Sequence, residues 1–158
     1  MKKLISIVLG LTFVLGLAGC TNNQDEIKTF SFRGEHEYFS ISNGSIVLND
    51  AEEVFYGGEL EITDSEAFTD MSSFTVTFYT LINGEKDIIM SNSVIDETGG
   101  SVNISGDLGR MSGEGLLTGS KIDNVSDLKN NLYFELSFVN LDGVESTYQI
   151  QLTVTDKE

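Results

Sequence analysis

The sequence predicts an all-β fold, an antiparallel β-sandwich of about seven strands, on three observations. Apolar and polar residues alternate with a period of two in several short stretches, as they do in half-buried strands. The chain has 16 glycines and no proline, and Asn-Gly or Asp-Gly pairs separate several of these stretches. No stretch carries the long apolar face of a helix. The sandwich could have an immunoglobulin-like arrangement, and a small barrel is the alternative.

The shorter strands are predicted from apolar residues two positions apart, which share one face of a strand. These pairs are Phe30 with Phe32, Phe39 with Ile41, Leu60 with Ile62, and Val102 with Ile104. Asn43-Gly44 is predicted to be a turn between two strands, because both residue types tolerate the backbone of tight turns. Two helical turns are expected, one within residues 64–70 and one at 126–130, where Ser126 would be the N-cap.

A hairpin is predicted around Asn83-Gly84, and its register depends on the length of its loop. Its first strand has one apolar face, made of Phe74, Val76, Phe78 and Ile82. A two-residue turn would place Phe78 opposite Ile89 and Val76 opposite Ser91. A three-residue loop of residues 82–84 would place Phe78 opposite Ile88 and Val76 opposite Met90. We favour the longer loop because it pairs more apolar residues on one face, with Gly84 at positive φ in a β-bulge.

The last hairpin has the clearest alternation in the chain. Its two apolar faces consist of Leu132, Phe134, Leu136 and Phe138 on the first strand, and Tyr148, Ile150, Leu152 and Val154 on the second. A two-residue Asp142-Gly143 turn would pair Leu136 with Gln149. A three-residue loop of residues 141–143 would pair Leu136 with Tyr148 and Phe134 with Ile150. The three-residue loop is again favoured, because it sets one apolar face against the other.

The N-terminus has the pattern of a secretory signal peptide. Lys2 and Lys3 give it a positive start, and residues 4–18 are apolar or small without a charge. As a helix this run would span roughly 22 Å at 1.5 Å per residue, short of the hydrocarbon core of about 30 Å. A run of this length, followed by small residues, is typical of a signal sequence that is cleaved.

The end of this segment, Leu17-Ala18-Gly19-Cys20, resembles the lipobox of bacterial lipoproteins. The resemblance implies cleavage after Gly19, a signal peptide of residues 1–19, and a diacylglyceryl group on the sulfur of Cys20. Cys20 is the only cysteine, so it has no partner for an internal disulfide. Two acyl chains give stable attachment where one does not. Residues 20–29 are then expected to be the lipidated cysteine and a flexible tether, and residues 30–158 a single sandwich domain.

Net charge limits the partners of this domain. Loss of residues 1–19 leaves seven basic residues, the nine of the full chain less Lys2 and Lys3, against 25 acidic residues, a net charge of −18. Nucleic acid is excluded as a partner because phosphate binding requires basic patches. The same charge opposes close contact of the domain with anionic lipid. It favours solubility, and a cation-binding role is the alternative.

No catalytic, metal or cofactor site is predicted. Glu35 and Glu37 would lie on the strand face opposite His36, so this histidine is expected at the surface or core edge. Two acidic groups lack the spacing of an EF-hand loop; they are Asp64, Glu66 and Asp70, and Asp123 with Asp127. The glycine-rich segment 105–120 lacks the Gly-Lys-Ser order of a phosphate loop and is predicted to be a mobile loop.

The stretch 30–44 resembles the start of small uncharacterised lipoproteins of low-GC Gram-positive bacteria. The resemblance rests on Phe32, on Gly34-Glu35, and on Tyr38 or Phe39. It implies a β-sandwich and no particular activity. The sequence therefore predicts a non-enzymatic lipoprotein, anchored through Cys20 to the outer face of a cell membrane, that binds an envelope protein or polysaccharide which the sequence does not identify. A calcium-responsive accessory lipoprotein is the alternative.

Overall fold

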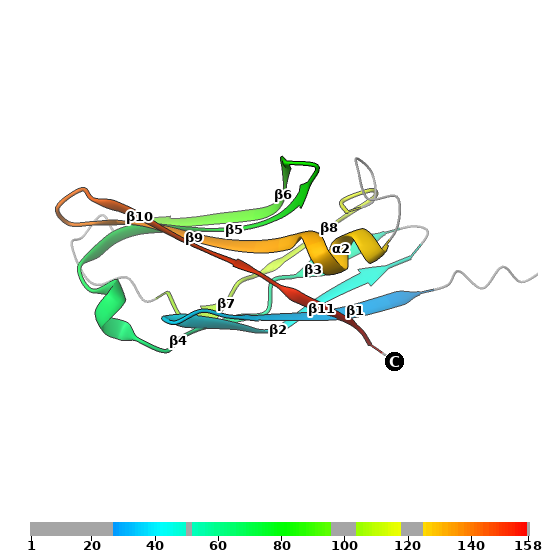
Figure 1. Cartoon of the computed structure of the whole chain (residues 1–158), viewed down its shortest axis with the longest axis horizontal. Helices are drawn as coiled ribbons and strands as arrows, with labels where there is room; N and C mark the ends of the chain where they lie inside the picture. The colour runs from blue at the N-terminus through cyan, green and yellow to red at the C-terminus, as the bar shows by residue number, and fades with distance from the viewer. Residues whose placement is uncertain (1–26, 50–51, 96–103, 118–124, 158) are drawn as a thin grey trace, which may run out of the picture.

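The computed structural model describes residues 27–49, 52–95, 104–117 and 125–157 of the chain, which form two antiparallel sheets packed face to face (Figure 1). The predicted all-β sandwich is confirmed. Its elements are β1 (Lys28–Glu35), β2 (Phe39–Leu48), β3 (Glu53–Tyr56), β4 (Glu59–Ile62), the 3₁₀ turn η1 (Ser65–Phe68), β5 (Met71–Ile82), β6 (Glu85–Ile95), β7 (Gly106–Asp107), β8 (Arg110–Gly113), α2 (Val125–Asn131), β9 (Leu132–Asn140), β10 (Glu145–Gln151) and β11 (Thr153–Asp156).

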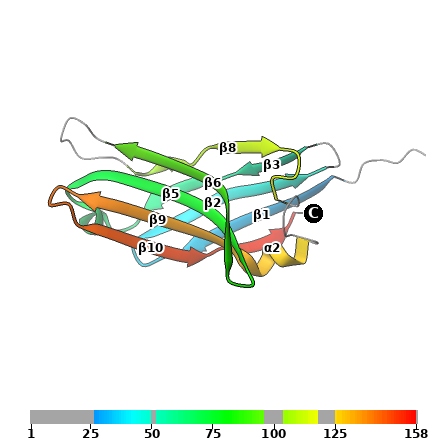
Figure 2. The same ribbon diagram turned by 90° about the horizontal axis from the view of Figure 1, so that it is seen from above.

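Within the described residues, one sheet has seven strands and the other four. The first has the order β11-β1-β2-β3-β8, with β4 continuing the line of β3 and β7 that of β8. The second has the order β10-β9-β5-β6 and lies over the first when the molecule is seen from above (Figure 2). After β10 the chain crosses to the other sheet at Leu152, whose N–H donates to the Leu132 carbonyl over 2.8 Å. β10 and β11 are therefore two parts of one path that joins the layers.

Aromatic rings fill the space between the sheets. Phe78 of the four-stranded sheet is fully buried and contacts Phe32 and Phe55 of the other sheet, with ring centroids 5.8 and 5.1 Å apart. Phe134 lies 5.0 Å from Phe78 on the neighbouring strand. The residues whose alternation predicted the strands supply this core, because the period of two sends every second side chain inward.

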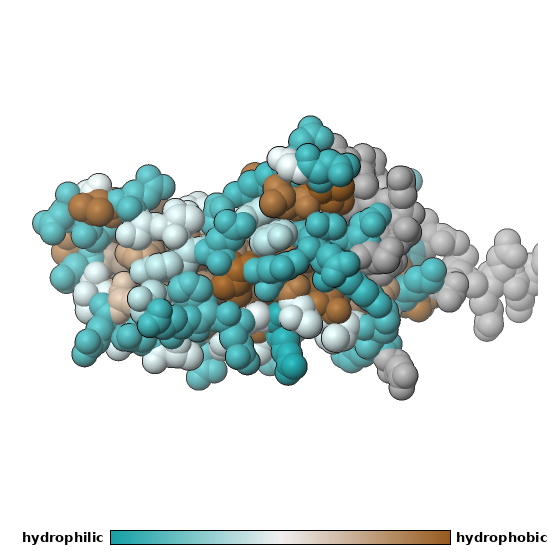
Figure 3. Space-filling view, viewed as in Figure 1, coloured by the Kyte–Doolittle hydropathy of each residue, from teal (hydrophilic) through white to brown (hydrophobic). Residues whose placement is uncertain are grey.

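The register of the last hairpin is confirmed. Leu136 lies opposite Tyr148 and Phe134 opposite Ile150, as the three-residue loop requires. Gly143 takes φ +77°, a conformation that favours glycine. The tip of this hairpin exposes Leu141 and Val144, and apolar atoms are visible at that end of the molecule (Figure 3).

The predicted register of the first hairpin is wrong. Ile82 lies opposite Glu85, so Asn83 and Gly84 form a two-residue turn, and both have positive φ, 54° and 82°. Such a turn matches the right-handed twist of the strands. A register shift next to Phe78 then leaves Phe78 opposite Met90 instead of Ile88. The bulge restores an apolar pair on the inner face without a longer loop.

Three further expectations are corrected. Asn43-Gly44 is not a turn between strands but lies inside β2, where Asn43 has φ 58°. The glycine-rich segment predicted to be a loop contains β7 and β8. Ile104 is buried but precedes β7 without belonging to a strand, and Val102 lies outside the described residues.

The expected helical turns are present, and the domain starts earlier than predicted. η1 occupies the first of them, and α2 begins at Val125, one residue before the predicted cap. α2 contacts β11 and β5 at the end of the sandwich where the C-terminus lies (Figure 1). β1 begins at Lys28, which pairs with Leu48, so two residues of the predicted tether belong to the sheet. Cys20 lies outside the described residues.

Candidate functional site

Two neighbouring lines of strands in the seven-stranded sheet, β3 with β4 and β8 with β7, are interrupted at the same level, beside the continuous strand β2. β2 pairs with β4 through residues 39–42 and with β3 through residues 45–48. Gly57 and Gly58 separate β3 from β4, and the stretch 108–109 separates β7 from β8. Two backbone hydrogen bonds of 2.9 Å join the breaks, from the Gly57 N–H to the Gly109 carbonyl and from the Leu108 N–H to the Gly58 carbonyl. Irregularities of this kind redirect side chains and are common beside binding sites.

The breaks depend on backbone conformations and contacts that exclude larger residues. Gly58 has φ +79°, and a Cβ there would lie 2.2 Å from the carbonyl oxygen of Ser42. Gly109 has φ +92°. Asn43, beside them on β2, also has positive φ, which asparagine tolerates better than most residues. The local sequence therefore produces a double break, at residues 57–58 and 108–109, instead of two longer regular strands.

A cleft of about 330 Å³ lies at this double break. It is lined by Asn43, Tyr56, Gly58, Glu59, Asp107, Gly109 and Arg110. Tyr56 and Glu59 are exposed, and the inner face of the same strands carries Phe55 and Leu60. The cleft therefore opens on the outer, solvent-facing side of the sheet. Its volume is at the lower end of the range for small-molecule sites.

The polar groups of the cleft are partly held by one another. Asn43 Nδ2 donates to Glu59 Oε2 over 3.1 Å. The Gly109 N–H donates to Asp107 Oδ1 over 2.6 Å. The Arg110 guanidinium lies over the Tyr56 ring, 5.4 Å from its centroid. Each contact occupies one part of a side chain. The amide of Asn43, the carboxylates of Glu59 and Asp107 and the guanidinium of Arg110 carry further acceptors or donors.

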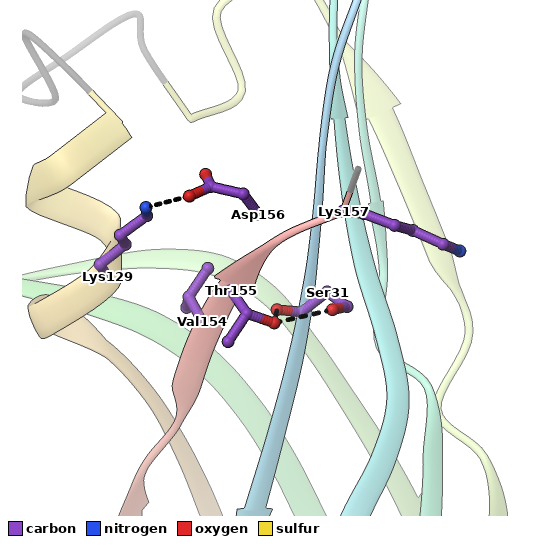
Figure 4. A pocket seen from close by; sticks show the side chains of 6 residues that line it. All are labelled: Ser31, Lys129, Val154, Thr155, Asp156 and Lys157. Carbon is purple, nitrogen blue, oxygen red and sulfur yellow. Dashed lines mark hydrogen bonds and ion pairs between the residues drawn. The ribbon is translucent and has the colours of Figure 1, made fainter.

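A second hollow, of about 610 Å³, lies near the C-terminus (Figure 4). It is lined by Ser31, Lys129, Val154, Thr155, Asp156 and Lys157. Lys129 Nζ is paired with Asp156 Oδ2 at 2.6 Å, and the Ser31 and Thr155 hydroxyls are 3.0 Å apart. Lys157 points away from the other labelled side chains. Since its main cation is already paired and its second cation points elsewhere, this hollow is the weaker candidate.

His36 belongs to an aromatic group that closes one end of the sandwich. Its ring stacks on Phe39 with centroids 4.8 Å apart, and lies 5.0 Å from the Tyr148 ring. Its Nδ1 accepts the Tyr38 N–H over 3.3 Å. The negative charge of Glu37, with a smaller effect of burial, raises the pKa of Tyr38 above its ordinary value of 10.0. These contacts confirm the expected place of His36 at the edge of the core.

The predicted acidic groups have structural roles where they are described. Asp64 Oδ1 accepts the Glu66 N–H over 3.0 Å and caps η1. Asp70 has φ 59° just before β5, and Asp127 lies in the first turn of α2. Asp123 lies outside the described residues. In the described ranges, three or more His, Cys, Asp or Glu side chains do not gather anywhere in an arrangement that could hold a metal ion.

Glu53 is a buried polar group, although nothing in the sequence around Glu52 and Glu53 indicated burial. It is 6% exposed, and its Oε2 accepts the Leu117 N–H over 2.5 Å. This hydrogen bond connects Leu117, in the segment that follows β8, to β3. It lies on the opposite face of β3 from the cleft. A buried carboxylate held by a backbone N–H is a structural support for the sheet edge.

The cleft residues Asn43, Tyr56, Glu59, Asp107 and Arg110 were not predicted as a site. The one signal for them was the glycines at 57, 58, 106 and 109, which interrupt two alternating stretches. No family model, curated protein or solved structure matches this chain. Among the described residues, none of the helices combines the length and the apolar character needed to cross a bilayer.

Proposed function

We propose that this chain is a non-enzymatic binding module, anchored by lipid on Cys20 to the outer face of a bacterial membrane. The cleft at the double break carries the binding part of the proposal, because it gathers an aromatic ring, an amide, two carboxylates and a guanidinium on a solvent-facing surface. The lipobox-like residues 17–20 support the anchor. A β1 start at Lys28 leaves seven residues, 21–27, to link the cysteine to the sheet, at most about 24 Å when extended.

The character of the cleft favours binding over catalysis. Glu59 and Asp107 are both exposed. Catalytic carboxyl groups commonly lie in a buried or apolar pocket, which this outer face does not provide. The remaining polar side chains are Asn43, Tyr56 and Arg110, which hold ligands through hydrogen bonds and stacking.

The anchor predicts that Cys20 carries the lipid. In bacteria producing the chain, the wild-type protein should incorporate labelled palmitate and stay with the membrane fraction. The Cys20→Ser variant should lose the label completely, because serine has no sulfur to form the thioether. Equal labelling of the two forms would contradict the anchor.

The binding role predicts contact between the cleft and the envelope. A photoreactive phenylalanine analogue at position 56 in the full lipoprotein should cross-link to a defined envelope component. The same analogue at position 144 is the control. Val144 is 57% exposed and Tyr56 only 38%, so random collision would label the control position more strongly. Cross-linking at position 144 equal to that at position 56 would contradict a binding role of the cleft.

A further inference from the structure

Opposite charges lie at neighbouring cross-strand positions in the cleft. Glu59 of β4 is directly opposite Asp107 of β7, and Tyr56 of β3 is directly opposite Arg110 of β8. Two like charges that face each other across strands destabilise a sheet. The cleft therefore has an acidic end, where two carboxylates repel, and a basic end, where a guanidinium lies on a tyrosine ring.

Neither end is neutralised by the other. Among the described residues, Arg110 makes no ion pair, and its contact is the face of the Tyr56 ring. Stacking on the ring orients the planar guanidinium and leaves its N–H donors at the edge of that plane. Within the described ranges, Glu59 and Asp107 receive hydrogen bonds only from neutral groups, the Asn43 amide and the Gly109 N–H. The charged groups at both ends of the cleft can therefore pair with a ligand.

We propose that the cleft binds a small zwitterion, a ligand with an ammonium group and a carboxylate a few bonds apart, as in a free α-amino acid. The ammonium would lie between Glu59 and Asp107, with the Asn43 carbonyl oxygen as a third acceptor. The carboxylate would accept hydrogen bonds from Arg110. This assignment rests on the proposed binding function and specifies its ligand class.

The two charged ends argue against simpler ligands. A plain anion attracted by Arg110 would be repelled by the two carboxylates, and a plain amine attracted by the carboxylates would be repelled by Arg110. A zwitterion gains from both ends at once. Gly58 and Gly109 add no side chains to the lining, so the ligand can approach the backbone closely.

The test uses three probes of nearly equal size with the full-length protein in detergent micelles. Glycine carries both charges, glycinamide carries only the ammonium, and acetate carries only the carboxylate. Binding is followed at neutral pH by NMR shifts of the Gly58 and Gly109 amides, which report the location as well as the affinity. Glycine is expected to bind at least tenfold more tightly than either other probe.

Charge-removing variants assign each end of the ligand. In Arg110→Ala the affinity for glycine should fall to that for glycinamide. In Glu59→Gln combined with Asp107→Asn it should fall to that for acetate. As controls, Arg33→Ala removes one positive charge at an exposed position of β1 and Glu145→Gln one negative charge at an exposed position of β10. Both should leave the glycine affinity unchanged.

Two results would overturn the assignment. Equal binding of the three probes, or no shift at either glycine amide with millimolar glycine, would exclude a zwitterion site. The cross-linking experiment separates this failure from failure of the proposed function. Cross-links from position 56 without a response to glycine would keep the binding role and reject this ligand class.

Discussion

Replacing Gly58 by alanine is expected to lower the free energy of unfolding by about 3 kcal/mol or more. The added Cβ would lie 2.2 Å from the Ser42 carbonyl oxygen, 2.6 Å from the Gly44 nitrogen and 2.9 Å from the Gly44 Cα. All three are backbone atoms of β2, so no change of side-chain rotamer can relieve the overlap. The positive φ of Gly58 adds a further cost for any residue with a Cβ. Urea unfolding of the purified protein measures the loss.

Gly143→Ala is the matched control for this prediction. Gly143 has φ +77°, almost the same as Gly58, but a Cβ there would have no atom within 4 Å. This control should therefore show only the conformational cost, about 1–2 kcal/mol. The difference between the two variants isolates the close approach of β2 to the Gly57-Gly58 break. Equal losses for both variants would show that β2 is not packed against Gly58, and the geometry of the cleft would be wrong.

The register of a hairpin could be predicted only where its alternation was unambiguous. In the last hairpin, Tyr148 and Ile150 are separated by a polar residue, so one register alone sets apolar against apolar. In the first hairpin, residues 88–90 are three apolar residues in a row, and the sequence leaves open which of them point inward. In the structure the turn has two residues, and a bulge next to Phe78 determines which of the apolar residues lie on the inner face. A bulge leaves no signal in a stretch that is apolar at every position.

The fold class followed from local pattern, but the cleft depends on distant pairing. Asn43, Glu59 and Asp107 meet because β4 pairs with both β2 and β7. Each of these residues alone is an ordinary polar residue of a strand. Glu59 lies opposite Ser42, 17 positions earlier in the chain, and opposite Asp107, 48 positions later. The glycines at the breaks were visible in the sequence, but glycine equally marks turns. The breaks form a site only because strand pairing places them side by side, which the sequence does not show.

Replacing Phe78 by alanine is expected to cost about 3–5 kcal/mol of the free energy of unfolding, the range for a buried phenylalanine. Its ring contacts Phe55 and Phe32 across the sandwich and Phe134 on the neighbouring strand. The loss of one ring therefore opens a cavity bordered by both sheets. A Cβ on Gly57 would lie 3.1 Å from this ring, so the same side chain also supports the strand break under the cleft.

Unfolding in urea and near-UV circular dichroism test this prediction together. The midpoint should fall at an unchanged slope, and the aromatic signal of the folded state should persist, because a cavity weakens a two-state fold without changing the surface exposed on unfolding. Leu141→Ala removes an apolar side chain that is 58% exposed and should change stability by no more than about 0.5 kcal/mol. A cost for Phe78→Ala as small as that of the control would mean that the two sheets do not share one core. The cleft would then lose the rigid layer on which its charged side chains are positioned.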